Sequence, residues 1–303
     1  MIRILDSNFE AWGVLKNTTE SSRVETLNGE NTLSFTALLT TKLSELIDKD
    51  SIFELEGQRF DIKTLKKSLT EENAYVAEVS AEHISYRLND PQYNKEYFTE
   101  MGSPEYILGK MLAGTSFSVG TVDIGGSLTY SAQEEKSRRA LIMELAYLVG
   151  GDLQFNNFTV DLLQHRGSTE LKPAIKDRNI KVVTHEIAKQ LGSDNIESYT
   201  CEPVGIPKDT YSLGDNILLL NKTLDIQQYL RVVRVEYDPY DESSLSFEFA
   251  NYVSDLGDAV FEIITDAVSK DALMNGIRIG PEYGFEAVRN DRRARAYFRV
   301  GNT

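Results

Sequence analysis

The pattern of apolar and polar positions predicts antiparallel β-strands over much of the chain, most clearly in residues 211–253. An apolar run at 217–220 follows turn residues at 214–216, and a strand rich in β-branched residues covers 230–237. A turn at 238–241 contains proline and aspartate, which favour bent backbone. The next strand alternates, with one face formed by Leu245, Phe247 and Phe249. This segment predicts three strands of a barrel or sandwich, without catalytic residues.

Residues 1–88 follow a similar pattern. Gly57 can adopt the positive φ of a tight hairpin turn. We expect strands near residues 2–5, 12–15, 33–37, 51–56, 59–65 and 74–84.

Residues 89–170 predict an α/β unit. Ser103 is a candidate N-cap for a helix that ends near Gly114. Ser131 and Glu134 have the spacing of a capping box for a second helix, which Gly150 terminates. Its apolar face is formed by Leu141, Leu145 and Leu148. We also expect strand structure at 117–129 and a hairpin around Asn156-Asn157.

The rest of the chain predicts a second β region and a terminal segment. Residues 171–252 resemble residues 1–88 in composition, which suggests two related β modules. A helix is expected at 255–273, and a short strand at 296–300. The chain ends without a packing or capping signal, so we expect a longer native polypeptide. The predicted domains are 1–88, 89–170, 171–252 and 253–303.

Composition and charge restrict the function. A length of 303 residues favours two or more domains. The net charge of −15 argues against a nucleic-acid-gripping protein, because such proteins present basic patches. A single cysteine excludes intrachain disulfides. Neither a signal peptide nor an apolar stretch of membrane-spanning length is evident in the sequence.

The chemistry-bearing residues do not form a known catalytic or metal motif. His83, His165 and His185 lie far apart in sequence and lack an H-E-x-x-H pattern. Cys201 could act as a nucleophile, but a buried strand residue is the commoner fate of a free cysteine. Acidic pairs at 71–72 and 134–135 are typical of solvated faces, and glycine pairs at 125–126 and 150–151 are typical of turns. The sequence therefore predicts no catalytic, cofactor-binding or metal-binding residue.

Four stretches resemble a known family. Tyr211-Ser212-Leu213-Gly214-Asp215 and the later Arg234-Val235-Glu236-Tyr237-Asp238-Pro239 are similar to the second half of phage tail hub proteins. These are the prophage endopeptidase tail, or tail-associated lysin, proteins of siphophages. Residues 145–167 and 275–298 also resemble that family, whereas residues 184–210 depart from its pattern.

The resemblance implies an α+β fold of the phage baseplate-hub type, with two β-barrel-like tube domains and α/β insertions. It implies a homotrimeric ring with pseudo-sixfold symmetry. The distal tail protein and tail tube would lie above this ring, and fibre or tip components below. Peptidoglycan hydrolysis, where present, would belong to a C-terminal domain beyond the hub.

The leading hypothesis is a structural tail-tip hub in the virion, made in the host bacterial cytoplasm, which lets DNA pass without specific binding during ejection. Its acidic surface would repel DNA in the channel. One alternative is a tail-associated endopeptidase that acts on cell-wall peptidoglycan. Another is a receptor-binding module in which some of the 15 tyrosines and 13 phenylalanines bind wall glycans.

Overall fold

A computed structural model describes residues 1–16, 18–71, 73–188 and 196–250, and four further strands between 272 and 298. The chain divides into two compact units, Met1–Val253 and Ser254–Thr303. Most of the helix expected at 255–273 lies outside the described residues, but Ala272 and Leu273 belong to a strand. The second unit contains an antiparallel sheet of β19 (Ala272–Met274), β20 (Ile277–Gly280), β21 (Gly284–Val288) and β22 (Ala294–Phe298).

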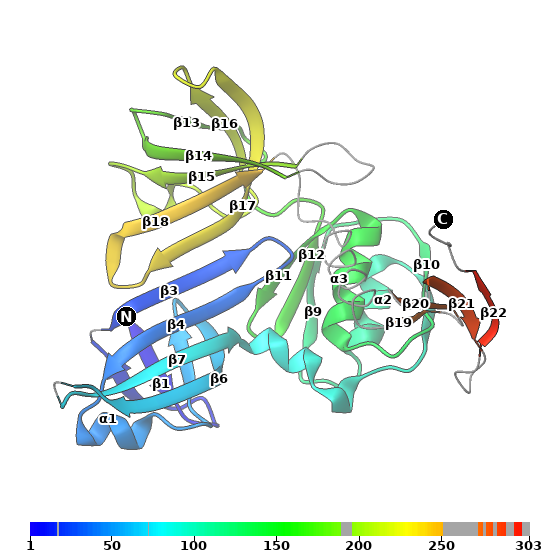
Figure 1. Cartoon of the computed structure of the whole chain (residues 1–303), viewed down its shortest axis with the longest axis horizontal. Coiled ribbons are helices and arrows are strands. Elements are labelled where there is room, and N and C mark those ends of the chain that lie inside the picture. Colours follow the sequence, from blue (N-terminus) through cyan, green and yellow to red (C-terminus); the bar gives the residue numbers. More distant parts are fainter. Residues whose placement is uncertain are drawn as a thin grey trace, which may run out of the picture. The chain divides into compact units, whose positions relative to one another are not determined.

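The first unit is built on a sheet of thirteen strands (Figure 1). Along its main path the order is β14-β15-β18-β17-β3-β4-β7-β6-β5-β1-β2, while β16 joins β17 and β13 joins β16. The strands are β1 (Ile2–Leu5), β2 (Ala11–Leu15), β3 (Thr19–Thr26), β4 (Asn31–Leu38), β5 (Ile52–Leu55), β6 (Gln58–Leu69), β7 (Tyr75–His83), β13 (Lys172–Ile175), β14 (Ile180–Ala188), β15 (Ile196–Pro203), β16 (Asn216–Asn221), β17 (Ile226–Asp238) and β18 (Asp241–Ala250).

Two sets of five strands in this sheet repeat one topology. The first β module, β3 to β7, has the order β3-β4-β7-β6-β5, and the second β module, β14 to β18, has the order β14-β15-β18-β17-β16. The register of β6 against β7 shifts between Ile62 and Thr64, and that of β17 against β18 shifts between Val232 and Arg234. A bulge at the same place in both modules indicates matching registers as well as matching order. The two related β modules expected from composition are therefore present.

Each module encloses its own apolar core, because its strands alternate buried and solvent-facing positions. In β4, for example, Leu33, Phe35 and Ala37 are buried and the residues between them are less so. The second core includes Tyr199, Phe247 and Phe249. The path of the described strands runs from β14 to β2 without closing on itself, so the structure is mostly β-sheet with few helices but not a closed barrel.

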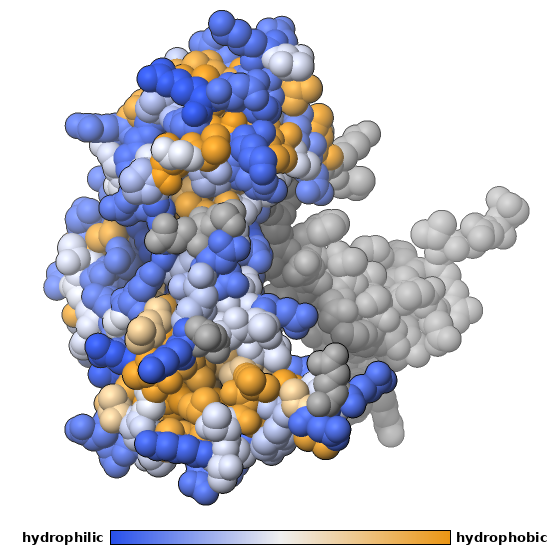
Figure 2. All heavy atoms as spheres, turned by 90° about the vertical axis from the view of Figure 1, so that its left-hand side faces the viewer, coloured by the Kyte–Doolittle hydropathy of each residue, from blue (hydrophilic) through white to orange (hydrophobic). Residues whose placement is uncertain are grey.

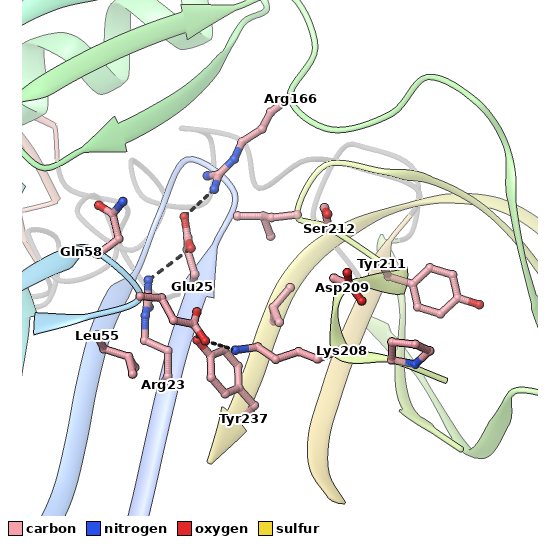
Figure 3. Close-up of a pocket in the computed structure, with 14 residues that line it drawn as sticks. Arg23, Glu25, Leu55, Gln58, Arg166, Lys208, Asp209, Tyr211, Ser212 and Tyr237 are labelled. Atoms are coloured by element: carbon pink, nitrogen blue, oxygen red, sulfur yellow. Dashed lines mark hydrogen bonds and ion pairs between the residues drawn. The ribbon is translucent and has the colours of Figure 1, made fainter. Parts of the chain in front are cut away.

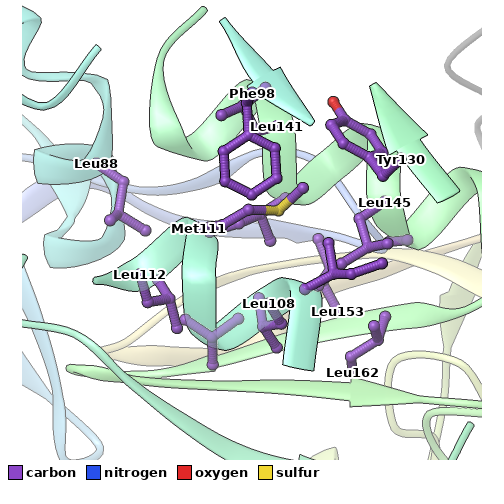
Figure 4. Close-up of a cluster of buried hydrophobic side chains, with 14 of the residues drawn as sticks. Leu88, Phe98, Leu108, Met111, Leu112, Tyr130, Leu141, Leu145, Leu153 and Leu162 are labelled. Atoms are coloured by element: carbon purple, nitrogen blue, oxygen red, sulfur yellow. The ribbon is translucent and has the colours of Figure 1, made fainter. Parts of the chain in front are cut away.

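Between the two modules in sequence comes an α/β unit with a third core (Figure 4). Helices α2 (Pro104–Leu112) and α3 (Arg138–Val149) contribute much of this core, with Leu108, Met111, Leu141 and Leu145 fully buried. Two small sheets complete it, one of β8 (Phe98–Gly102) and β10 (Leu128–Ala132), the other of β9 (Ser118–Val122), β11 (Asp152–Asn156) and β12 (Thr159–Leu163).

The predicted start of the second helix is wrong, although its end is confirmed. Ser131 lies in β10 opposite Thr99, and the two hydroxyls are 2.9 Å apart. The N-cap is Ser137, whose hydroxyl accepts a hydrogen bond from the amide of Ala140 at 3.1 Å. Gly150 ends the helix with a φ of 63°. Pairing with β8 thus uses the residues that the capping-box pattern assigned to the helix.

Some elements were not predicted. The short helix α1 (Thr41–Leu46) and the strand β3 lack a clear apolar pattern. The sequence of β3 is TESSRVET, with Val24 as its one aliphatic residue. This polar strand nevertheless lies at the centre of the thirteen-stranded sheet.

Apolar side chains also gather on one part of the surface (Figure 2). They lie over the first β module, in the lower half of that view. Large exposed apolar residues include Trp12 and Val14 of β2 and Leu38 and Leu69 of the first β module. Contiguous apolar surface of this kind is typical of protein contact sites.

Candidate functional site

The two β modules are joined by a backbone ladder between β3 and β17, which we call the seam. The strands run antiparallel, with Thr26 opposite Arg234 and Arg23 opposite Tyr237. Beyond the ladder, the amide of Leu27 donates to the carbonyl of Val233 at 2.8 Å. The seam makes one continuous sheet of two modules that are far apart in sequence.

A buried ion cluster lies beside the seam (Figure 3). The Glu25 carboxylate accepts hydrogen bonds from the guanidinium of Arg166 at 2.7 Å and from that of Arg23 at 3.2 Å. Arg23 is only 5% exposed, and its guanidinium lies 4.9 Å from the ring centroid of Phe60. Burial alone would raise the pKa of Glu25, but the two guanidiniums outweigh it and hold that pKa below its ordinary value. Glu25 is therefore ionised in the folded protein at neutral pH.

A second set of polar contacts crosses the same space from the β5–β6 turn. The hydroxyl of Tyr237 donates to the Glu56 carboxylate at 2.7 Å, and the ammonium of Lys208 pairs with the same carboxylate. That ammonium also lies 3.4 Å from the Tyr237 ring centroid. Burial raises the pKa of Tyr237, and the hydrogen bond to Glu56 adds to the effect. These contacts connect a turn of the first β module with β17 and the segment before β16.

These groups line a pocket of about 660 Å³. Its charged lining has three cations, Arg23, Arg166 and Lys208, and three carboxylates, which belong to Glu25, Glu56 and Asp209. Each of the three cations pairs with a carboxylate of the lining. Within the described residues, no group of three or more His, Cys, Asp or Glu side chains could hold a metal ion. The lining thus joins residues of the first β module, the segment after β12 and the second β module.

Further ion pairs attach the α/β unit to the seam. Arg231 of β17 contacts Asp152 of β11 at 2.7 Å, and the same carboxylate accepts from the backbone amide of Arg166 at 2.7 Å. On the other side, Arg139 of α3 donates to the carbonyl of Gly29 at 2.8 Å. The three cores of the first unit are thus fixed to one another by polar contacts.

The segment Tyr211–Asp215, which carried part of the sequence resemblance, forms a tight loop against residues 166–168. The Asp215 carboxylate accepts from the amide of Ser168 at 2.6 Å and pairs with Lys172 at 2.6 Å. Gly214 has a φ of 89°, and a Cβ at this position would lie 2.0 Å from the carbonyl oxygen of Arg166. Only glycine fits here without a rearrangement of the backbone.

The turn between β17 and β18 closes onto the N-terminal strands. The hydroxyl of Tyr240 accepts from the amide of Ile2 at 3.1 Å and donates to the carbonyl of Leu15 at 2.6 Å. Ile2 and Leu15 are partners in the β1–β2 ladder. Nearby, the hydroxyl of Ser21 donates to Asp238 at 2.5 Å. The second β module therefore also fixes the start of the chain.

The structure distributes the histidines and the cysteine over separate environments. His83 is buried, with Nδ1 3.0 Å from the Ser85 hydroxyl, and burial together with Arg23 lowers its pKa to about 3. The buried Nε2 of His165 has no hydrogen-bond partner. His185 of β14 stacks on Tyr199 at 4.4 Å.

Cys201 lies on the neighbouring strand β15, opposite Val183, and burial raises the pKa of its thiol to about 12. A thiol in this state is a poor nucleophile. Of the acidic pairs, Glu135 accepts a hydrogen bond from Asn94 at 2.8 Å, and Glu72 lies outside the described residues.

The residues of the seam were not identified from the sequence. Arg23 and Glu25 lie in a strand without an apolar alternation, so the pattern that reveals strands does not apply to them. A usable signal is the spacing of charges, since Arg23 and Glu25 alternate about Val24 as Arg234 and Glu236 alternate about Val235.

Comparison with known proteins identifies the N-terminal part of the chain. Residues 2–83 match the family model described as the prophage endopeptidase tail N-terminal domain. This part of the chain is therefore similar to that domain. The family resemblance inferred from residues 145–298 is thus confirmed. The residues that match the family model are, however, 2–83 and not 145–298. No curated protein sequence matches the chain.

Solved structures show that the fold extends beyond the prophage tail N-terminal domain. The prophage tail protein gp18 from Listeria monocytogenes EGD-e matches 87% of this chain and 98% of its own, with a TM-score of 0.66 and 12% identity. The 43 kDa tail protein of prophage MuSo2 from Shewanella oneidensis matches 82% and 97%, with a TM-score of 0.60 and 11% identity.

A third similar structure comes from a secretion system. The Escherichia coli c3393 protein matches 82% of this chain and 76% of its own, with a TM-score of 0.52 and 12% identity. It is described as a component of the type VI secretion system with structural similarity to the T4 bacteriophage tail proteins gp27 and gp5. The fold of this chain is therefore that of prophage tail and hub-like proteins. No helix in the described part of the chain is long and apolar enough to cross a membrane.

Proposed function

We propose that this protein is the structural tail-tip hub of a phage or prophage. Three copies form a ring that closes or extends the tail tube, and DNA passes through its channel during ejection. The observation that carries this proposal is the internal repeat, because one chain supplies two β modules of the same strand order and register. Three chains then present six equivalent modules to a sixfold tube while remaining threefold toward the tip.

The prophage tail N-terminal domain and the tail-protein fold support a place in the virion. The proposed neighbours are the distal tail protein and tail tube on one side and fibre or tip components on the other. The apolar surface of the first β module is a candidate for one of these contacts. The chain is made in the bacterial cytoplasm before assembly.

The charged seam supports a structural role. Its ion pairs hold the two modules in one orientation, which a ring with a constant channel requires. The net charge of −15 favours a channel surface to which DNA does not adhere. We retain the division at residues 1–88, 89–170, 171–252 and 253–303, with two tube domains of barrel-like form, as part of the proposal.

Electron cryomicroscopy of the purified phage tail tests the proposal. We expect density for this chain at the tail tip with threefold symmetry, and a ring of three 34.1 kDa chains. Location of the chain in the capsid, or in a sixfold or asymmetric position of the tail, would refute it. Release of peptides from purified cell wall by the pure protein would favour the endopeptidase instead.

A further inference from the structure

The internal repeat makes the seam a template for a second contact. In the seam, the first strand of the first β module, β3, pairs with the fourth strand of the second β module, β17. The corresponding strands with the modules exchanged are β14 and β6. In one chain, six strands of the sheet separate β14 from β6, so they do not pair with each other. The equivalent contact can form only between two copies.

Both strands have an open edge where this contact requires one. β14 is the last strand of the sheet path in the described part of the chain. β17 pairs with β16 through residues 226–231 and with β3 through residues 234–237. In β6, residues 58–61 pair with β5 in the same manner, and residues 62–69 have no described strand on that side. Thr64–Lys67 of β6 therefore occupy the place that Arg234–Tyr237 occupy in β17.

The shared bulge and ladder registers define which residues would meet. Leu65 and Val235 are equivalent positions. Leu65 pairs with Val79, which pairs with Phe35 on the next strand. In the second β module, Val235 pairs with Phe247, which pairs with Cys201 on the next strand. The strands β4 and β15 are equivalent in the same way. Their ladders with β3 and β14 make Val24 of β3 equivalent to Glu186 of β14. Transfer of the seam register then predicts these pairs between copies: Thr64 with Ala188, Leu65 with Ile187, Lys66 with Glu186, and Lys67 with His185.

The side chains at these positions are chemically complementary. Lys66 and Glu186 are exposed and carry opposite charges, and opposite charges placed across an antiparallel ladder stabilise it. Leu65 meets Ile187, whose side chain is 57% exposed in the single chain although it is strongly apolar. The β6 segment is basic and the β14 segment contains an acid. The β6 edge of one copy is therefore better matched by the β14 edge of a second copy than by another β6 edge.

We infer that the β14 edge of one copy pairs antiparallel with Thr64–Lys67 of the next copy, which reproduces the internal seam between chains. This contact is head-to-tail, since it joins two different surfaces, and such contacts form rings when the rotation closes. The inference rests on the proposed ring and specifies its interface. Every junction between neighbouring modules, within and between chains, is then a β-strand ladder of the same kind.

Mixed single-cysteine variants test this pairing directly. Lys66→Cys and Glu186→Cys change exposed residues, so both proteins should fold, and the native thiol of Cys201 is buried. Oxidation of an equimolar mixture should give a disulfide-linked dimer that neither variant gives alone. A mixture of Lys63→Cys with Glu186→Cys is the matched control, because three residues along a strand displace the thiol by about 10 Å. Equal cross-linking in both mixtures, or none in either, would overturn the inference.

Charge reversal provides an independent readout. Lys66→Glu should weaken association about fivefold for each contact, and Glu186→Lys in the same chain should restore it. Within its own chain Lys66 pairs across the β6–β7 ladder with Glu78 at 2.8 Å. Arg3→Glu is the control, because Arg3 is likewise exposed and pairs across a ladder with Glu54 at 3.1 Å, but lies away from the edge. A weakening of association by Arg3→Glu as large as that by Lys66→Glu would contradict the inference.

The two proposals fail in different ways. A threefold ring at the tail tip whose chains do not cross-link through positions 66 and 186 would refute this interface and leave the hub in place. A specific cross-link in a protein that is absent from the tail tip would refute the hub and establish the interface.

Discussion

The Glu25 carboxylate provides the sharpest test of the seam, because it neutralises two guanidiniums that have little access to water. The side chains of Arg23 and Arg166 are 6% and 16% exposed, and that of Glu25 is 26% exposed. Glu25→Gln keeps the size of the side chain and one acceptor oxygen but removes the charge. Removal of one partner from a fully buried ion pair costs about 3–5 kcal/mol. Since Glu25 retains contact with water, we expect a loss of about 2–3 kcal/mol in the free energy of unfolding.

Urea unfolding at pH 7, followed by the fluorescence of the only tryptophan, Trp12, measures this loss. The matched control is Glu30→Gln, which removes the carboxylate that pairs with Arg234 at 3.1 Å. The Glu30 side chain is 43% exposed, so its loss should cost about 0.5 kcal/mol. If Glu25→Gln costs no more than Glu30→Gln, the ion cluster does not hold the modules together and the reasoning is refuted.

The loss of stability in Glu25→Gln should depend on pH. The pKa of Glu25 is lowered in the folded protein from an ordinary value of 4.5, so its contribution is present above pH 4.5. As the pH falls below 4.5 the unfolded chain takes up the proton first, and the contribution declines until the folded carboxylate is protonated. The stability difference between wild type and Glu25→Gln should therefore shrink steadily below pH 4.5. A difference that stays constant down to pH 3 would contradict the assignment.

Three further predictions concern other parts of the first unit. Gly214→Ala should lower the free energy of unfolding by more than about 3 kcal/mol, because its Cβ would meet the Arg166 carbonyl at a positive φ. Tyr240→Phe should cost about 1–2 kcal/mol, since it removes the hydrogen bond to the Leu15 carbonyl and leaves that group unpaired. Cys201 should resist thiol reagents in the native protein up to pH 9, because burial raises its pKa to about 12, and it should react at once in urea.

Controls make these outcomes decisive. Gly150→Ala also places a Cβ at positive φ but meets no atom within 4 Å, so it should cost only about 1 kcal/mol. Equal losses at the two glycines would show that the close approach at Gly214 is unimportant. For Tyr240, an unchanged rate of amide exchange at Ile2 in the variant would contradict its role at the β1–β2 ladder. Rapid labelling of native Cys201 would contradict its burial.

Local sequence patterns predicted the elements whose stability depends on apolar faces. The three strands of residues 211–253 and the hairpins at Gly57 and Asn156-Asn157 are present. Their signals are short-range, since alternation and turn chemistry act within a few residues. The predicted start of α3 was wrong because Ser131 pairs with Thr99 of another strand, a long-range contact that the capping-box spacing cannot detect.

The seam could not be predicted in this way, because its residues are polar and their partners are distant. Arg23 and Glu25 form a strand through contacts with β17 and with Arg166, not through an apolar face of their own. Composition suggested the two modules, but a residue-level repeat between them is not visible in the sequence, for a related reason. Phe35, Val79 and Leu65 lie side by side on neighbouring strands of the first β module. The equivalent positions in the second β module hold Cys201, Phe247 and Val235, so the positions match while most residue types differ.

The two strands of the seam are synthesised at different times on the ribosome. Ser22 and Glu236, which are hydrogen-bonded at 2.9 Å, lie 214 residues apart. At about 5–20 residues per second, β17 emerges roughly ten to forty seconds after β3. During this interval the β3 edge is available to any other nascent strand. The polar and charged sequence of β3 then lowers the risk of aggregation. A strand with few apolar side chains is a poor template for aggregation before β17 has been synthesised.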